Sequence, residues 1–136
     1  MLSAADAELA ALLRCMQPVL NGGIYVYCAV PPHIDLHGLD VLATFREREG
    51  LTVILAEAAA RAAGLPILFR AAWITLNVDS ALSAVGFTAA FARALGDAGI
   101  ACNVIAAARH DHVFVPVERA RDALDCLLAL QRSAQG

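Results

Sequence analysis

The sequence contains no lysine, so its ten basic residues other than histidine are all arginines, and they are dispersed along the chain. This absence excludes a Schiff-base lysine and the lysine of a phosphate-binding loop. The formal net charge is -3. Affinity for a phosphate backbone rests on clustered basic side chains, so we expect no nucleic-acid partner.

Long apolar segments are also missing, although 60% of the residues are hydrophobic. No uninterrupted apolar run approaches the roughly 18 residues of a membrane span, because Glu57, Asn103 and Asp111 interrupt the candidates. The four cysteines form no CxxC pair and are interpreted as small buried side chains. Asp6 and Glu8 stand where a secretion signal would be basic and apolar. We expect a cytoplasmic protein without a membrane partner.

Signatures of common enzyme classes are absent as well. The chain has no G-x-S-x-G elbow, no H-E-x-x-H motif and no phosphate loop. A Cys102 nucleophile with a His110 base can be imagined, but a thiol inside a strand is usually inert. The sequence therefore predicts no catalytic residues and no cofactor, and it favours a binding protein over an enzyme.

The most regular pattern covers residues 73–116. Alternation of apolar residues predicts a strand over 73–78, and helical spacing follows over 83–99. Residues 100–107 are apolar on both faces, which predicts an interior strand, and 112–115 is expected to pair with it. A strand, a helix and a strand hairpin in this order form half of a ferredoxin-like unit.

The rest of the chain predicts a comparable set of elements. They are a first helix that ends before Pro18, strands over residues 24–30, 41–48 and 51–55, a short helix over 57–63, a connection over 65–71, and a closing helix after Pro116. We divide the chain into an N-terminal half, 1–65, and a C-terminal half, 66–136. Each half offers three strands where a complete unit has four, so the halves are expected to complete one another, within the chain or across a homodimer.

Two strings of residues resemble a small bacterial group of paired ACT-domain proteins. They are residues 80–116, SALSAVGFTAAFARALGDAGIACNVIAAARHDHVFVP, and residues 44–55, TFREREGLTVIL. The resemblance implies an α+β fold of tandem ferredoxin-like, ACT-type units with antiparallel sheets packed against helices. ACT domains as a class bind amino acids or similar small ligands and regulate enzymes of amino-acid metabolism. The resemblance therefore implies a regulatory protein with a small-molecule ligand.

The turn of residues 79–87 is the first candidate site. Backbone N–H groups are free where a strand passes into a helix, and they suit a carboxylate. Gly86 would let a ligand approach the backbone closely. The resemblance places Val85, Gly86 and Phe87 at the loop that contacts ligands in ACT domains. The alternative is a tight helix start in which Ser80 or a neighbouring serine caps its own backbone.

Asn103, His110 and His112 are further candidates. Asn103 interrupts an apolar strand, so its amide needs partners, which are either the polar groups of a ligand or a backbone group or water. His110 and His112 flank Asp111 at a predicted hairpin turn. Three interpretations stay open: residues that fix the turn, residues that recognise a ligand or sense pH, and metal ligands.

The leading hypothesis is a regulatory ACT-type protein that binds a small molecule, and specifically an amino acid. Its predicted ligand contacts are Ser80, Val85, Gly86, Phe87, Asn103, His110 and His112. No metal ligand is assigned. The alternatives are a metal-binding protein or metal-dependent enzyme that uses His110 and His112, and a structural dimerisation partner of a metabolic enzyme.

Overall fold

One antiparallel sheet runs through the whole protein, whose structure is a computed structural model describing residues 2–135. Six of its seven strands follow the order β3-β4-β2-β5-β7-β6, and the seventh, β1, pairs with β5 outside this path. The strands are β1 (Pro18–Leu20), β2 (Tyr25–Val30), β3 (Val41–Arg46), β4 (Leu51–Ala56), β5 (Ile67–Leu76), β6 (Asn103–Ala106) and β7 (Asp111–Pro116). The helices are α1 (Ala4–Arg14), α2 (Glu57–Ala62), α3 (Phe87–Asp97), the short 3-10 helix η1 (Val117–Arg119) and α4 (Ala120–Ser133).

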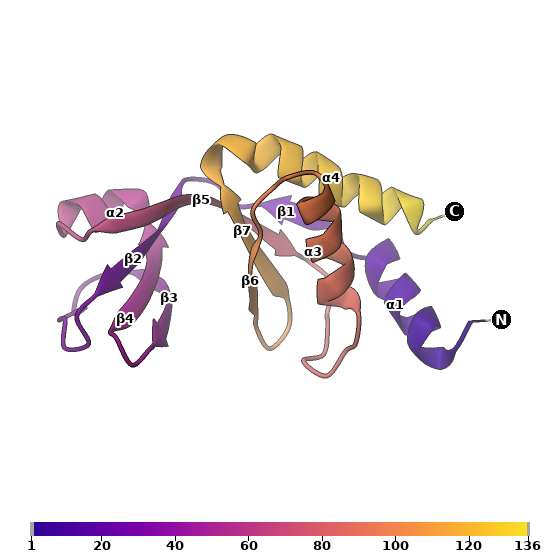
Figure 1. The fold of residues 1–136 in the computed structure, drawn as a ribbon, viewed down its shortest axis with the longest axis horizontal. Helices are drawn as coiled ribbons and strands as arrows, with labels where there is room; N and C mark the ends of the chain where they lie inside the picture. The colour runs from indigo at the N-terminus through magenta and orange to yellow at the C-terminus, as the bar shows by residue number, and fades with distance from the viewer. Residues whose placement is uncertain (1, 136) are drawn as a thin grey trace.

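Strand β5 joins the two halves of the molecule. Its first residues pair with β2, and its last residues pair with β1 on one edge and β7 on the other. Ala71 lies at the crossing point, because it is opposite Tyr25 of β2 and also opposite Pro116 of β7. Figure 1 shows β5 passing from the group of β2, β3 and β4 to the group of β7, β1 and the larger helices.

The predicted connection over residues 65–71 is wrong, because β5 begins at Ile67. Pro66 ends the preceding turn, but it stands just ahead of the strand, where a missing N–H costs no ladder hydrogen bond. The alternation predicted from Trp73 onward therefore starts six residues earlier than expected. A β-bulge near Leu68 shifts the register between β2 and β5, and it hides this early alternation in the sequence.

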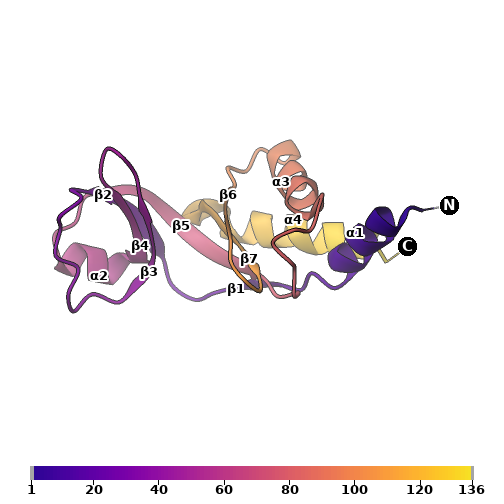
Figure 2. The same ribbon diagram turned by 90° about the horizontal axis from the view of Figure 1, so that it is seen from below.

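Helices cover one face of the sheet. In the C-terminal half, α3 and α4 pack on Ile74 and Val113, and α1 closes the side of this core. In the N-terminal half, α2 places Ala60 on Val26 and Leu55. Figure 2 shows α2 at one end of the molecule and the three longer helices at the other. Within residues 2–135, every helix is too short or too polar to cross a lipid bilayer.

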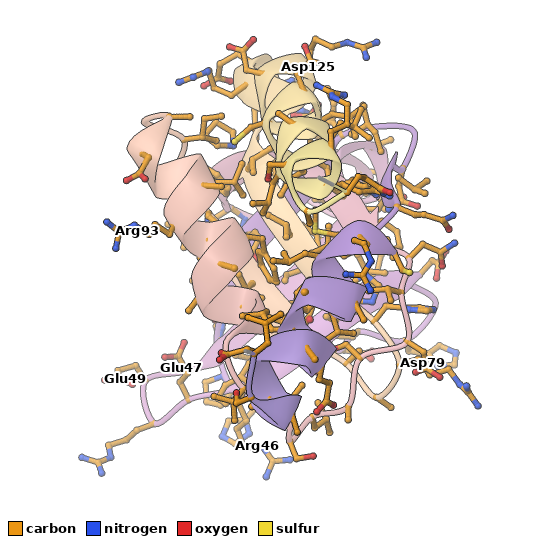
Figure 3. The ribbon with its side chains drawn as sticks, turned by 90° about the vertical axis from the view of Figure 1, so that its right-hand side faces the viewer. Arg46, Glu47, Glu49, Asp79, Arg93 and Asp125 are labelled. Atoms are coloured by element: carbon orange, nitrogen blue, oxygen red, sulfur yellow. The ribbon has the colours of Figure 1, made fainter. Side chains whose placement is uncertain are left out.

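The sequence predicts that this helix begins at Ser83, but helix α3 begins at Phe87. Gly86 has φ of 96°, a left-handed conformation that interrupts the helical path, and residues 81–84 form a separate turn. Phe87, Phe91 and Leu95 follow the helical spacing predicted over 83–99 and are all buried. Ala98, predicted on the same stripe, is exposed because it caps the end of the helix. Charged residues such as Arg93 of α3 and Asp125 of α4 extend outward from the helices (Figure 3).

The predicted interior strand over residues 100–107 is also wrong. The strand is shorter, and it lies at the edge of the sheet with β7 as its neighbour. Both faces of this strand are nevertheless apolar, because each packs against a different hydrophobic cluster. Val104 packs against the helix-covered core, whereas Ile105 packs on the opposite face of the sheet. Burial on two faces therefore resembles the pattern of an interior strand.

We predict that Phe91→Ala lowers the free energy of unfolding by about 3–5 kcal/mol, because the ring is fully buried and packs edge-on against Phe87. Phe45→Ala is the matched control, since 71% of Phe45 is exposed, and it should change the value by about 0.5 kcal/mol or less. Urea denaturation followed by circular dichroism measures both. Equal losses in the two variants would contradict this assignment of the core.

Candidate functional site

The face of the sheet that no helix covers carries a cluster of aromatic side chains. Its members are Tyr25, Tyr27, Phe69, Trp73 and Phe114. Neighbouring rings in the cluster have centroids 5.1 to 6.2 Å apart. Alternation along a strand brings them to one face, because every second residue points the same way. The cluster forms an apolar floor that spans both halves of the molecule.

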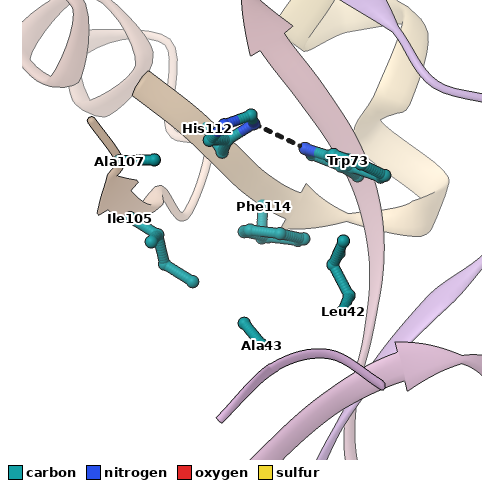
Figure 4. Close-up of a pocket in the computed structure, with 7 residues that line it drawn as sticks. All are labelled: Leu42, Ala43, Trp73, Ile105, Ala107, His112 and Phe114. Carbon is teal, nitrogen blue, oxygen red and sulfur yellow. Dashed lines mark hydrogen bonds between the residues drawn. The ribbon is translucent and has the colours of Figure 1, made fainter. Parts of the chain in front are cut away.

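Two adjoining hollows lie on this floor, between the edge strands β3 and β6. One has a volume of about 230 Å³ and the other of about 420 Å³, and Ala43 and Ile105 line both. We refer to the two hollows together as the edge groove. Figure 4 shows the first hollow, with Leu42 and Ala43 on one side and Ile105, Ala107 and His112 on the other. The second is lined by Tyr27, Ala43, Thr44, Phe45, Thr52, Ile54, Cys102, Asn103, Val104 and Ile105.

The described side chains that line the edge groove include none with a formal charge at neutral pH. Burial, and to a lesser degree the neighbouring Cys102, raises the pKa of Tyr27 to about 12, so its hydroxyl stays protonated. Burial also raises the pKa of the Cys102 thiol. A thiol that resists ionisation is a poor nucleophile, so Cys102 is suited to packing. The groove offers neutral hydrogen-bonding groups in an apolar setting.

His112 presents a defined hydrogen-bonding group to the groove. The indole N–H of Trp73 donates to its Nδ1 atom at 3.0 Å, and Thr75 Oγ1 lies 3.1 Å from the same nitrogen. Because indole can only donate, Nδ1 is the acceptor and the ring carries its proton on Nε2. Asn21 supports the network by donating to Thr75 at 3.0 Å. The Nε2–H group is thus left to serve as a donor.

The protonation state of His112 follows from its surroundings. Burial lowers its pKa, the nearby His110 lowers it further, and Asp111 opposes the shift. Asp111 lies on the other face of β7, where burial raises the pKa of its carboxyl group. A neutral imidazole is therefore the form that the folded protein favours near neutral pH.

Asn103 is the second predicted residue that lines the edge groove. The expectation of a buried amide is wrong, because Asn103 stands exposed on the edge strand β6. Its Nδ2 group donates to the carbonyl oxygen of Phe114 at 3.3 Å. This bond to the backbone leaves Oδ1 as an acceptor beside the groove. The ligand contact predicted for Asn103 stays a prediction.

Four other predicted contacts lie in a region that we call the corner, residues 79–87. Ser80 is buried and its N–H donates to the carbonyl oxygen of Arg109 at 2.9 Å. Phe87 belongs to the core, whereas 81% of Val85 is exposed. A side chain of α1, Leu9, covers Gly86, and a hollow of about 160 Å³ remains between α1 and residues 83–85. The structure therefore divides the predicted set among the groove, the corner and the β6–β7 turn, where His110 lies.

His110 and His112 serve different parts of the structure. His110 Nδ1 lies 2.9 Å from the carbonyl oxygen of Val78, so this ring ties the β6–β7 turn to the segment after β5. Asp111, between the two histidines, faces the helix-covered side. Within residues 2–135, no three His, Cys, Asp or Glu side chains gather into a set that could hold a metal ion.

Comparison with known proteins identifies the family. A family model of the ACT domain matches residues 4–72, just over half of the chain, and a second matches residues 68–129. The chain belongs to the ACT-domain family. It carries two ACT-type domains in tandem, which confirms the resemblance, and the predicted boundary between residues 65 and 66 stays a prediction. No curated protein matches this ACT protein.

Solved structures confirm the ferredoxin-like ACT fold. A Vibrio cholerae protein of unknown function is 44% identical, with a TM-score of 0.84 over 94% of this chain and 99% of its own. The regulatory subunit of aspartate kinase from Thermus thermophilus is 13% identical, with a TM-score of 0.66 over 85% of this chain and 97% of its own. At that identity the likeness concerns the fold alone. The fold class predicted for the ACT protein is confirmed.

The aromatic floor is the part of the site that the sequence analysis misses. The segment IYVYCAV contains the signal, because Tyr25 and Tyr27 are two residues apart and must share a face of any strand. Phe69 and Trp73 repeat that signal on β5. Recognising it requires that residues 67–72 be a strand, and their interpretation as a connection removes Phe69 from consideration.

We predict that Gly86→Ala lowers the free energy of unfolding by roughly 1–3 kcal/mol, because a side chain is strained at φ of 96° and its Cβ would lie 3.2 Å from Leu9. Gly96→Ala is the control within the same helix. The Cβ added at Gly96 meets no atom within 4 Å, so this variant should raise the free energy of unfolding by roughly 0.5–1 kcal/mol. Thermal unfolding measures the loss of stability in Gly86→Ala and the gain in Gly96→Ala. A Gly86→Ala variant more stable than the wild type would contradict the left-handed conformation of Gly86.

His112 should make stability depend on pH. Its pKa is lower in the folded state than in the unfolded chain, so its contribution is fully present above the unfolded value of about 6.5 and is lost as pH falls. We predict that the advantage of the wild type over His112→Gln in unfolding free energy shrinks between pH 7 and pH 5. The comparison removes the main part of the opposing effect of Asp111, because burial, the largest cause of its raised pKa, is present in both proteins. If the stability advantage of the wild type grew as pH fell, the neutral state assigned to His112 in the folded protein would be refuted.

Proposed function

We propose that this ACT protein is a regulatory protein that binds a small molecule, specifically an amino acid, in the edge groove. The observation that carries the proposal is the arrangement of four side chains from β6 and β7 on the open face. Asn103 pairs with Phe114, and Ile105 pairs with His112. The two polar residues therefore occupy one diagonal of a square, and the two apolar residues occupy the other.

This square matches the chemistry of an amino acid. The Oδ1 atom of Asn103 can accept from an α-ammonium group, and the Nε2–H group of His112 can donate to an α-carboxylate. Diagonal neighbours on paired strands are roughly 7 Å apart, a span that a small zwitterion can bridge. The apolar diagonal, Phe114 and Ile105, then lies beneath the ligand. Free backbone groups along the outer edges of β3 and β6 add further hydrogen-bonding capacity.

The position of the groove suggests how a bound ligand changes the conformation of the protein. Its walls come from β3 and β4 in one half and from β6 and β7 in the other. Within the sheet these strands are linked through β2 and β5, and Ile54 of β4 also packs with Phe114 of β7 on the open face. A ligand that touches both walls stabilises conformations in which the edge strands are close, and its effect equals its differential affinity for them. The structural likeness to regulatory subunits of aspartate kinase supports a regulatory role.

The corner is a second location for the same ligand. Its residues Ser80, Val85, Gly86 and Phe87 stay within the proposal, because the hollow beside Val85 borders the start of α3. The edge groove has the stronger support, since Leu9 covers Gly86 and the N–H of Ser80 is already bonded. The predicted homodimer and cytoplasmic location also belong to this proposal. Unpaired edges on β3 and β6 favour association between copies.

We predict that at least one common amino acid raises the melting temperature of the protein. A ligand at 100 times its dissociation constant contributes about 2.7 kcal/mol. Ala43 lines both hollows of the edge groove, so Ala43→Trp should fill the groove and abolish the shift. Ala84→Trp fills the hollow at the corner and should leave the shift unchanged.

Thermal-shift measurements with a panel of the common amino acids, followed by calorimetric titration, carry out this test. The apo melting temperature of each tryptophan variant controls for misfolding. Loss of the shift in Ala84→Trp alone would move the site to the corner. The absence of a shift with every amino acid would refute the proposed ligand class.

A further inference from the structure

We infer that the edge groove selects amino acids with an uncharged, apolar side chain and discriminates against acidic and basic ones. The inference rests on the proposed function and narrows its ligand class. Three properties of the groove carry it: the absence of charged lining residues, the orientation of the charged side chains nearby, and the composition of the floor.

The charges of the ligand must balance in the groove. A zwitterion brings one positive and one negative group, and Asn103 and His112 offer one neutral acceptor and one neutral donor to them. A third charge on the ligand's own side chain would enter an apolar hollow without an opposite charge. Burying a charge without a partner is costly, so such a ligand is disfavoured.

Charged residues on the surrounding strands do not supply that partner. Arg70 of β5 pairs with Glu57 at the helix-covered face, where its Nη2 atom lies 3.2 Å from Oε1. Asp111 of β7 is buried on that same face. Arg46 of β3 lies opposite Leu51, whose side chain packs under α2. Strands β2, β4 and β6 contain no charged residue.

The turn between β3 and β4 brings a carboxylate to the end of the groove. Glu47 accepts from Thr52 Oγ1 at 3.0 Å, and Thr52 lines the second hollow. Figure 3 labels Glu47 with Arg46 and Glu49 at the outer side of the molecule. Glu47 is exposed, so solvent screens it. The negative charge of Glu47 adds to the discrimination against acidic ligands. Binding of lysine tests whether the same charge attracts basic ligands.

The floor supplies a positive preference for apolar side chains. Trp73 and Phe114 stack with an interplanar angle of 13°, and Tyr27 packs edge-on against Phe114. Ile105 borders this surface and is partly buried, whereas Ile54 and Phe114 are buried beneath it. Apolar area removed from water contributes roughly 25 cal/mol per Å², so a leucine-sized or larger side chain laid on the floor gains affinity that glycine or alanine lacks.

The experiment compares three groups of amino acids by calorimetric titration at one pH and ionic strength. Leucine, methionine and phenylalanine represent apolar side chains, aspartate and glutamate acidic ones, and lysine and arginine basic ones. We predict at least about tenfold tighter binding of an apolar ligand than of any charged one, a difference of about 1.4 kcal/mol. Ile105→Ala should weaken the apolar ligand severalfold, whereas Leu68→Ala, at a residue 72% exposed and outside the groove, should not.

The outcomes separate this inference from the proposed function. A charged amino acid that binds as tightly as the apolar ones, and loses binding in Ala43→Trp, would overturn the selectivity while the proposed site stands. Equal affinity of the wild type and Ile105→Ala for the apolar ligand would also overturn it, provided that circular dichroism shows the variant folded. Failure of every amino acid to bind would overturn both proposals together.

Discussion

The pairing of β5 along both of its edges is the constraint on which the molecule depends. The strand is ten residues long, and each half of the chain completes its sheet against a different part of it. The register shifts between β2 and β5, and again between β3 and β4. Because bulges increase the local twist, the sheet curls, and its two edge strands approach each other on the uncovered face. The edge groove is a consequence of that curl.

Strand alternation then decides what each face can do. On β7, Val113 and Val115 join the helix-covered core, whereas His112 and Phe114 face the groove. The buried Asp111 is separated from His112 by the sheet itself, although the two are neighbours in sequence. Titratable groups that look like one cluster in the sequence are thus assigned to different environments. This separation explains why the groove is neutral even though charged residues flank it in the chain.

Local patterns were sufficient for parts of this structure and insufficient for others. The stripe of Phe87, Phe91 and Leu95 was predictable because helix periodicity is a property of neighbouring residues. The start of β5 was not, because Pro66 resembles the end of a connection. Asn103 could be selected as a polar interruption of an apolar segment, and His112 as part of a polar group at a predicted turn. The aromatic floor beneath them could not, because it assembles from three strands whose order depends on long-range pairing.

The way the halves are joined bears on the regulation that we propose for the groove. Helix α2 packs on β2 and β4, whereas α1, α3 and α4 pack with one another at the opposite end. The relative orientation of the halves therefore depends on the twist of the shared sheet and on the cluster of Ile54, Ala71 and Phe114, which joins the halves on the uncovered face. A molecule held between β3 and β6 lies where that twist changes their separation most directly. Under the proposed function, the binding energy of such a molecule would be converted into sheet geometry, and a partner protein that contacts both halves would detect the change.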